Sequence, residues 1–163
     1  MTKYHANAIT VLGQSFDSQT EGEFYLYLLA RQQAGEITEI KLQPSFELQP
    51  RFKKDGHTIR PIIYIADFEV THADGTIEVI DVKGFETADF KIKKKLFDYR
   101  YPDLKLTRMK KVVKFGGWIT HEEWLKQKRR EKSESLGKTQ RSTTHRQQTP
   151  ARHQRRKTSR RTV

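Results

Sequence analysis

The fold is decided by the stretch PIIYIADFEVTHADGTIEVIDVK at residues 61–83, in which two apolar, β-branched runs flank a short polar segment. The runs at 61–71 and 76–83 have the composition of strands, and HADG at 72–75 separates them. Gly75 suits the left-handed position of a three-residue hairpin loop, a type I turn followed by a bulge. The stretch therefore predicts a β-hairpin.

Helical and strand patterns precede this hairpin. Residues 20–35 (TEGEFYLYLLARQQAG) predict a helix that Ser18 or Thr20 can cap and that a glycine ends. Residues 36–52 are strand-like but punctuated by prolines, and residues 53–58 (KKDGHT) predict a loop. Apolar residues at helical spacing form the expected buried stripe, which consists of Tyr25, Leu28 and Leu29.

Further elements follow the hairpin. Residues 87–100 predict an amphipathic helix with Thr87 as its cap, and residues 104–109 (LKLTRM) alternate as a strand does. The capping box THEE at 120–123 opens a short helix that runs through Leu125. The order is helix, strand, two hairpin strands, helix, strand, written α-β-β-β-α-β. We therefore predict an α+β fold of the α/β sandwich-like kind.

The net charge of +12 resides in one segment of the chain. Residues 1–125 contain 18 Lys/Arg and 18 Asp/Glu, whereas residues 126–163 contain 14 Lys/Arg and two Glu. The second segment has few apolar residues, so it cannot bury enough surface to offset its ordering entropy. We therefore predict a globular domain at 1–125 and a largely disordered basic tail at 126–163. Such a polycation commonly binds a polyanion, by default nucleic acid, although a purely solubilising tail has the same composition.

The composition excludes several other classes of protein. Cysteine is absent, which excludes disulfides, a thiolate nucleophile and cysteine-based zinc sites. The six histidines are scattered, and no two stand at metal-ligand spacing on one expected helix. No apolar run of roughly 18 residues occurs, so we expect no membrane-spanning segment and a soluble, intracellular protein.

Two aspartates of the hairpin are expected to face each other. A three-residue loop pairs His72 with Thr76, and counting back from that pair along both strands sets Asp67 opposite Asp81. Two-residue alternation puts Lys83 on the face of Asp81. Facing carboxylates in an apolar region repel one another, so we expect a divalent cation, Mg²⁺ or Mn²⁺, between them. The alternative is that both aspartates are solvated edge-strand residues and Lys83 is an ordinary ion-pair partner.

Asp67 on one strand and Asp81-Val82-Lys83 at the end of the next resemble the paired motifs of the PD-(D/E)xK, or restriction-endonuclease-like, nuclease superfamily. The core of that superfamily is α-β-β-β-α-β, the order expected above. Ala66 departs from the pattern because it stands where the superfamily name has proline, which is not a metal ligand. The resemblance implies a nuclease whose Mg²⁺ or Mn²⁺ is held by Asp67 and Asp81, with Lys83 acting on the attacking water.

A narrower resemblance covers roughly residues 3–100 and rests on several separated blocks of sequence. In the same order, these blocks are similar to those of a phage and prophage family known as domain of unknown function 1064. The resemblance implies an enzyme of phage or prophage DNA recombination, replication or branched-DNA processing, in the cytoplasm of a bacterial host or phage-infected cell. The blocks are Lys3-Tyr4, Phe16-Asp17-Ser18 with Glu21, Ala34-Gly35-Glu36-Ile37, Gln43-Pro44-Ser45-Phe46, Tyr64-Ile65-Ala66-Asp67-Phe68, Asp81-Val82-Lys83-Gly84 and Lys93-Lys94-Lys95-Leu96-Phe97.

Glu21, on the first predicted helix, enters the site through the same resemblance. It matches the acidic residue that completes many such sites as a metal ligand, directly or through water. Helical spacing puts Glu21 on the side of Tyr25 and Leu28, where an unpaired carboxylate is costly. The alternative is an ordinary first-turn acid, which the helix dipole favours.

Basic residues downstream of the hairpin are candidate contacts to nucleic-acid phosphates. Lys93 flanks the buried stripe of the 87–100 helix and could reach a phosphate near Asp81, whereas most lysines of such a run form a solvated face. The tail supplies further cations. The predicted nucleic-acid-binding residues are Lys91, Lys93, Lys95, Arg129, Arg130, Arg155 and Arg156.

The sequence thus predicts a divalent-metal-dependent endonuclease that hydrolyses DNA phosphodiester bonds. A non-catalytic DNA-binding protein on a nuclease-like scaffold is the alternative, and a structural or packaging protein built around the tail is a third. A scaffold without activity has no reason to keep all the site residues, which are Asp67, Asp81, Lys83 and Glu21. Nuclease cores of this size often work as dimers, so a homodimer is a further expectation, although no self-complementary surface can be read from the sequence.

Overall fold

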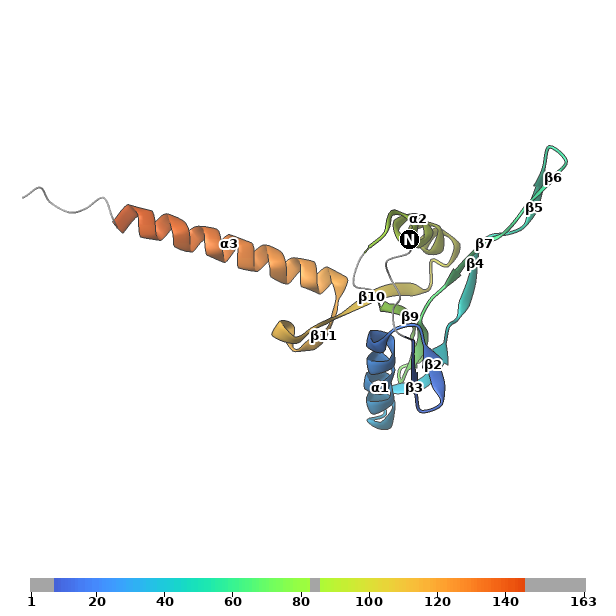
Figure 1. Cartoon of the computed structure of the whole chain (residues 1–163), viewed down its shortest axis with the longest axis horizontal. Helices are drawn as coiled ribbons and strands as arrows, with labels where there is room; N and C mark the ends of the chain where they lie inside the picture. Colours follow the sequence, from blue (N-terminus) through green and yellow to red (C-terminus); the bar gives the residue numbers. More distant parts are fainter. Residues whose placement is uncertain (1–7, 83–85, 146–163) are drawn as a thin grey trace, which may run out of the picture. The chain divides into compact units, whose positions relative to one another are not determined.

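A computed structural model of the chain describes residues 8–82 and 86–145, with side chains in the last helix described as far as Ser135 (Figure 1). The chain divides into two units, residues 1–124 and 125–163, and each is described by itself. The first unit combines helices with several sheets, which confirms the α+β prediction. Its elements follow the predicted α-β-β-β-α-β order, with additional strands inserted after the first sheet strand.

A five-stranded sheet forms the centre of the first unit. Its strand order is β11-β10-β9-β8-β3, and all neighbours are antiparallel except β9 and β10, which are parallel. The helix α2 makes the crossover between these two parallel strands, as such a connection requires. The strands are β3 (Ile37–Leu42), β8 (Phe68–His72), β9 (Ile77–Val82), β10 (Lys105–Val112) and β11 (Gly117–Thr120).

The predicted hairpin is confirmed in its turn and in its register. The N–H of His72 donates to the carbonyl of Thr76 at 2.8 Å, and Gly75 takes a φ of +84°. Strands β8 and β9 then pair from Thr71 opposite Ile77 back to Phe68 opposite Ile80. The three-residue loop therefore sets the register that the sequence predicted.

The continuous strand expected at 61–71 is instead two strands in two different sheets. Strand β7 (Ile62–Ile65) pairs with β4 (Ser45–Gln49), whereas β8 belongs to the central sheet. At the junction, the N–H of Ala66 donates to the carbonyl of Pro44 at 3.1 Å. The N–H of Asp67 donates to the carbonyl of Ile80 at 3.2 Å. Each backbone group is satisfied by a different partner, so the chain changes sheets without an unpaired donor.

The loop expected at 53–58 is a two-stranded ribbon. Strand β5 (Phe52–Lys54) pairs with β6 (His57–Ile59) across a two-residue turn. Both turn residues have positive φ, +50° at Asp55 and +75° at Gly56, as a type I′ turn requires. An Asp-Gly pair between short strand-like runs was the signal that the prediction passed over.

Both helices of the first unit begin where their caps predict. Helix α1 (Gln19–Gln33) is capped by the Ser18 side chain, and helix α2 (Ala88–Arg100) by that of Thr87. The small elements that complete this unit are strands β1 (Ile9–Val11) and β2 (Gln14–Phe16) and the 3-10 helix η1 (Val113–Phe115).

The buried stripe of α1 differs from the prediction. Phe24 and Leu28 are buried, whereas Tyr25 packs only at the edge of the core and Leu29 is half-buried. Gly22 explains why the buried face of α1 differs from the predicted one. A Cβ at this position would lie 2.7 Å from the Ile9 side chain, so only glycine allows β1 to pack here. The β1–β2 hairpin therefore packs closely against the first turns of the helix and selects which face turns inward.

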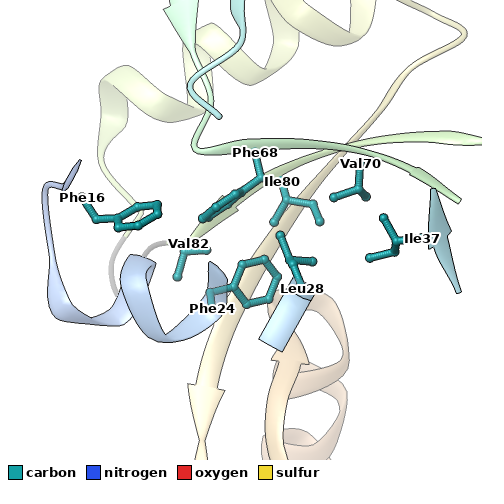
Figure 2. Close-up of a cluster of buried hydrophobic side chains, with 8 residues drawn as sticks. All are labelled: Phe16, Phe24, Leu28, Ile37, Phe68, Val70, Ile80 and Val82. Atoms are coloured by element: carbon teal, nitrogen blue, oxygen red, sulfur yellow. The ribbon is translucent and has the colours of Figure 1, made fainter. Parts of the chain in front are cut away.

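Two clusters of buried apolar side chains form the core. Alternation along β9 sends Ile80 and Val82 to one cluster and Val79 to the other, so Asp81 lies on the face of Val79. Figure 2 shows the first cluster, which consists of Phe16, Phe24, Leu28, Ile37, Phe68, Val70, Ile80 and Val82. The second consists of Phe46, Leu48, Tyr64, Ala66, Val79, Phe90, Phe97 and Leu106.

The last helix, α3 (His121–His145), begins at the predicted capping box. The Glu123 N–H donates to the Thr120 hydroxyl at 3.2 Å, and the Thr120 N–H donates to the Glu123 carboxylate at 3.3 Å. The predicted end near Leu125 is wrong, because the helix continues for 25 residues in all. Its sequence is rich in Lys, Arg, Glu and Gln, which have high helix propensity. Residues 126–145 of the tail predicted to be largely disordered lie in this helix, and residues 146–163 lie outside the described residues.

In the part of the chain that the structure describes, no helix has the length and apolar character needed to cross a membrane.

Candidate active site

Asp67 and Asp81 meet at the point where the chain changes sheets. Asp67 immediately precedes β8, and Asp81 lies near the end of β9. The β8–β9 ladder ends at Phe68 opposite Ile80, and the Asp67 N–H donates to the Ile80 carbonyl at 3.2 Å, so the regular register stops one residue short of the predicted Asp67–Asp81 pair. The two carboxyls still lie close enough to interact, because Asp81 raises the pKa of Asp67. The Asp81 side chain is completely buried. Two acidic groups therefore share one desolvated corner of the sheet.

The environment of Asp67 opposes its ionisation. Burial and repulsion from Asp81 raise the pKa of the Asp67 carboxyl to about 8, and the charge of Glu21 acts in the same direction. The Val82 N–H, which donates to Oδ2 of Asp67 at 2.6 Å, acts in the opposite direction. The raised pKa favours the protonated form of this carboxyl at neutral pH.

Tyr64 closes the same corner from β7. Its side chain is 4% exposed, and its hydroxyl is buried beside the two carboxylates without a well-formed hydrogen bond. Burial raises the pKa of the Tyr64 phenol, and repulsion from Asp81 and Asp67 adds to that effect. The phenol therefore stays neutral and contributes a polar O–H to an otherwise acidic corner.

Glu21 has the geometry of a capping-box acid and also acts on the site electrostatically. Its carboxylate accepts hydrogen bonds from the Asp17 N–H at 3.2 Å and from the Ser18 hydroxyl at 2.9 Å. Its negative charge also helps to raise the pKa of the Asp67 carboxyl, with a smaller effect than burial and Asp81. Among the described residues, no three His, Asp or Glu side chains are grouped closely enough to hold a metal ion by themselves.

Lys83, predicted to act on the attacking water, lies outside the described residues. So do Arg155 and Arg156 of the predicted nucleic-acid-binding set.

The predicted basic residues of α2 are largely engaged with neighbouring acids. Lys91 pairs with Glu86 at 3.7 Å, and the more buried Lys93 pairs with Asp89 at 3.2 Å. Lys95 is exposed. Partly exposed pairs of this kind contribute little to stability, so the lysines can exchange these acids for phosphates at small cost.

In the second unit, Arg129 and Arg130 lie on α3 and are exposed. Arg130 pairs with Glu134 at 3.2 Å, a helical spacing of four residues.

Arg108 is a site residue that the sequence analysis missed. It is the register partner of Asp81 on the neighbouring strand β10 and is only 8% exposed. Its guanidinium pairs with Glu86 at 3.2 Å and lies over the Phe90 ring, 5.4 Å from the centroid. Asp81 and Arg108 therefore lie side by side on β9 and β10, and Asp67, just before β8, lies beside Asp81.

A pattern in β10 could have revealed Arg108. In LKLTRM it stands two residues after Leu106, which is buried, so alternation sends the arginine to the same interior face. A cation at such a position is seldom buried without a partner, and the partner predicted by its register is an acid on β9.

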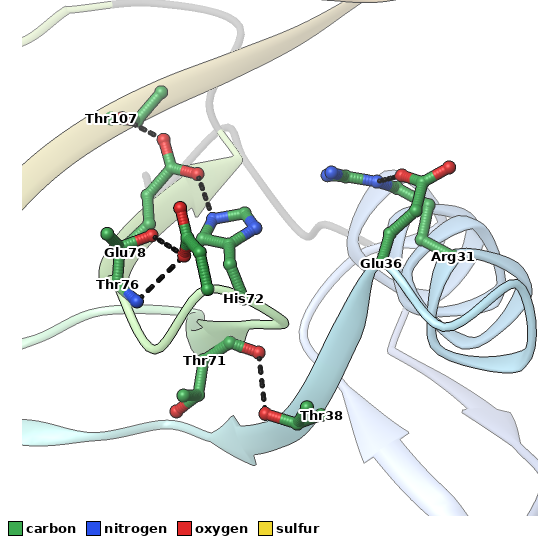
Figure 3. A network of polar contacts seen from close by, with 9 residues as sticks. Arg31, Glu36, Thr38, Thr71, His72, Thr76, Glu78 and Thr107 are labelled. Carbon is green, nitrogen blue, oxygen red and sulfur yellow. Dashed lines mark hydrogen bonds and ion pairs between the residues drawn. The ribbon is translucent and has the colours of Figure 1, made fainter.

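A separate polar network joins the strands on the opposite face (Figure 3). The Thr107 hydroxyl donates to Glu78, and the other oxygen of Glu78 lies 3.2 Å from Nε2 of His72. Glu78 shares the face of Ile80, whereas Asp81 points to the other side of the sheet. We therefore assign this network to the cohesion of β8, β9 and β10 and not to the acidic site.

The family described as "Protein of unknown function (DUF1064)" has a model that matches residues 1–117, so the chain belongs to this family. No match to the chain was found among curated proteins or among solved structures.

Proposed function

We propose that this member of the DUF1064 family is a divalent-metal-dependent endonuclease that hydrolyses DNA phosphodiester bonds. The observation that carries the proposal is the meeting of Asp67 and Asp81 in one buried corner, where the pKa of Asp67 is raised to about 8. Structural proteins rarely keep two adjacent buried acids, because desolvation and mutual repulsion both destabilise the fold.

The donor set of this corner suits a hard divalent cation. Asp67 and Asp81 offer carboxylate oxygens, and Glu21 is near enough for its charge to be felt at Asp67. Mg²⁺ prefers oxygen ligands, keeps several waters and commonly uses only one or two protein carboxylates. A set of two aspartates therefore fits Mg²⁺ or Mn²⁺ better than it fits zinc, which prefers nitrogen and sulfur ligands.

Each residue of the corner has a separate role in the proposed hydrolysis of a phosphodiester bond. A bound divalent ion supplies Lewis-acid stabilisation of the phosphate and lowers the pKa of a coordinated water. Asp67 and Asp81 would hold that ion, and Lys83 would position the attacking water. The guanidinium of Arg108, buried next to Asp81, offsets part of the acidic charge where an anionic phosphate must approach.

The strand arrangement supports the same function. An antiparallel β3-β8-β9 meander followed by α2 and the parallel strand β10 has the order expected for a PD-(D/E)xK core. As part of the proposal, the enzyme acts in the cytoplasm in phage or prophage DNA recombination, replication or branched-DNA processing. The basic residues of the second unit then provide salt-dependent attraction to DNA.

The test compares Asp81→Asn with the wild-type chain on labelled linear duplex, single-stranded, flap and four-way-junction DNA. We expect cleavage with Mg²⁺ or Mn²⁺, none with EDTA, and a loss of about 100-fold or more in the variant, as for removal of groups that support a metal. Asp74→Asn is the matched control, because Asp74 is an exposed acid in the turn of the same hairpin. DNA binding should survive in both variants.

Cleavage by Asp81→Asn at the wild-type rate, or cleavage that persists in EDTA, would remove the assignment. Binding without cleavage of any substrate by the wild-type chain would instead favour a non-catalytic DNA-binding protein.

A further inference from the structure

The outer end of the β4–β7 ribbon consists of residues 51–60, which include β5 and β6 and are called the outer ribbon. All ten of its residues are exposed. Figure 1 shows β5 and β6 continuing the ribbon beyond β4 and β7, away from the central sheet. The inner end behaves differently, because Phe46, Leu48 and Tyr64 are buried in the second core cluster. Burial in the core therefore accounts for the β4–β7 part of the ribbon, whereas the outer ribbon has no such role in packing.

Three of the four Lys and Arg side chains of the outer ribbon share one face, and Lys54 lies on the other. Lys53 pairs with Thr58 and Phe52 with Ile59, and continuing this register by one residue toward the base sets Arg51 opposite Arg60. Two-residue alternation puts these side chains on one face, which we call the cationic face. It carries three positive charges and no acid, since Asp55 lies in the turn. Within the described part of the chain, none of these three cations is in an ion pair or hydrogen bond with another side chain.

Protection of an exposed strand edge is the simplest alternative explanation of these charges. Lysines and prolines on an edge discourage pairing with other chains. Protection of that kind needs charge along the edge but does not need three cations on one face with no acid among them. This excess of cations on one face therefore points to an anionic partner that meets it.

We propose that the outer ribbon is a DNA-binding arm whose cationic face contacts the phosphate backbone of duplex DNA. The inference rests on the proposed nuclease function and extends it to the way in which duplex substrate is held. A two-stranded ribbon is narrow enough to enter or lie along a major groove about 12 Å wide. Lysine and arginine contacts to phosphates fix the position of a protein on DNA without reading its sequence.

The arm is directly connected to the acidic corner. Strand β7 leads from Arg60 at the base of the outer ribbon to Asp67, a path of seven residues. At about 3.3 Å per residue this path spans roughly 23 Å. For a ribbon that lies along the duplex axis, Arg60 then meets DNA up to about seven base pairs from the scissile phosphate, because neighbouring phosphates along a strand are about 3.4 Å apart along that axis.

The experiment uses the full chain in EDTA, so that binding is measured without cleavage, and a labelled linear duplex as the probe. Arg51→Gln/Lys53→Gln/Arg60→Gln removes the cationic face. Arg100→Gln/Lys105→Gln/Lys114→Gln removes the same charge from exposed positions elsewhere in the first unit and is the matched control. Fluorescence anisotropy then gives Kd over a series of salt concentrations.

We expect the arm variant to bind at least about ten-fold more weakly than the control, with the salt slope reduced by about 0.9 for each phosphate that the arm no longer neutralises. Hydroxyl-radical footprinting of the wild-type chain should show protection up to about seven base pairs from the cleavage position, and the arm variant should lose it. Equal binding by the arm variant and the control would overturn the inference. A change in sedimentation with unchanged DNA binding would also overturn it and assign the arm to a second copy of the chain.

Failure of the arm and failure of the nuclease proposal have different signatures. If the wild-type chain cleaves DNA with Mg²⁺ and the two triple variants bind DNA equally, only the proposal of a DNA-binding arm is contradicted. Weakened binding by the arm variant with no cleavage of any substrate would support the arm and remove the nuclease.

Discussion

The N–H of Val82 donates to Oδ2 of Asp67 at 2.6 Å, and this bond joins the junction between two sheets to the end of β9. Asp67 lies where the chain leaves the β4–β7 ribbon and enters the central sheet. The bond therefore holds the carboxylate toward Asp81 against their mutual repulsion. Lys83, which lies outside the described residues, follows Val82 directly in sequence.

The raised pKa of Asp67 predicts how stability depends on pH in the metal-free protein. Between the ordinary aspartate value and about 8, the folded state binds a proton that the unfolded state has released. The free energy of unfolding should therefore fall as pH rises through this window. Asp67→Asn removes the dependence, so its Tm relative to wild type should increase from about pH 5 to about pH 8 and then level off.

Thermal unfolding in EDTA provides the measurement, and Asp74→Asn provides the control. Hydrogen bonds from Thr76 lower the pKa of Asp74, so its contribution is present above the ordinary aspartate value and is lost only as pH falls through the lowered value. The Tm difference between Asp74→Asn and wild type should consequently stay constant between about pH 5 and about pH 8. A constant difference for Asp67→Asn as well would contradict the buried environment of that carboxyl.

Divalent cations should reverse the effect of pH. If Mn²⁺ or Mg²⁺ binds in place of the proton of Asp67, the rise in Tm on adding the metal should grow as the proton becomes easier to remove. Differential scanning fluorimetry with and without Mn²⁺ checks this for the wild-type chain. Asp74→Asn should respond like wild type, whereas Asp67→Asn/Asp81→Asn should show no metal-induced shift. An equal shift in the double variant would place the metal elsewhere.

Variants of Ser18 and Glu21 should distinguish helix capping by the first turn of α1 from a contribution of that turn to the metal site. Ser18→Ala removes the N-cap of α1 and should lower the free energy of unfolding by about 1 kcal/mol without changing the Mg²⁺ dependence of cleavage. Glu21→Gln retains a capping-box side chain and should be nearly as stable as wild type. If Glu21 contributes to the metal site, Glu21→Gln should need more Mg²⁺ for half-maximal cleavage. Wild-type cleavage and metal dependence in Glu21→Gln would leave Glu21 with the capping role alone.

Arg108 should matter for cleavage more than for DNA binding. Arg108→Gln removes a buried cation beside Asp81 and leaves the partner acid, Glu86, to solvent. We expect a loss of roughly 1–3 kcal/mol in stability and a fall in the cleavage rate with little change in Kd for DNA. Arg100→Gln, at the exposed end of α2, should change none of these quantities. A variant that loses stability but cleaves normally would give Arg108 a purely structural role.

Local signals in the sequence were sufficient to predict the secondary-structure elements that surround the site. The turn chemistry of residues 72–75 determined the hairpin register as far as Phe68 opposite Ile80, which brings Asp67 and Asp81 to the same end of the hairpin. The caps at Ser18 and Thr87 determined where two helices begin. These features depend on hydrogen bonds among residues within a few positions of one another, and such bonds can be predicted from the local sequence.

Only the tertiary structure decided the features that depend on distant partners. The change of sheets at Ala66 requires the Pro44 carbonyl, and the inward face of α1 requires Ile9 against Gly22. The burial of Arg108 beside Asp81 requires that β10 pair in parallel with β9 in one particular register. Period-two alternation shows which side chains share a face of a strand, but it does not show which strand lies alongside. That choice is made by packing over the whole sheet, and it placed the basic residue next to the acidic pair.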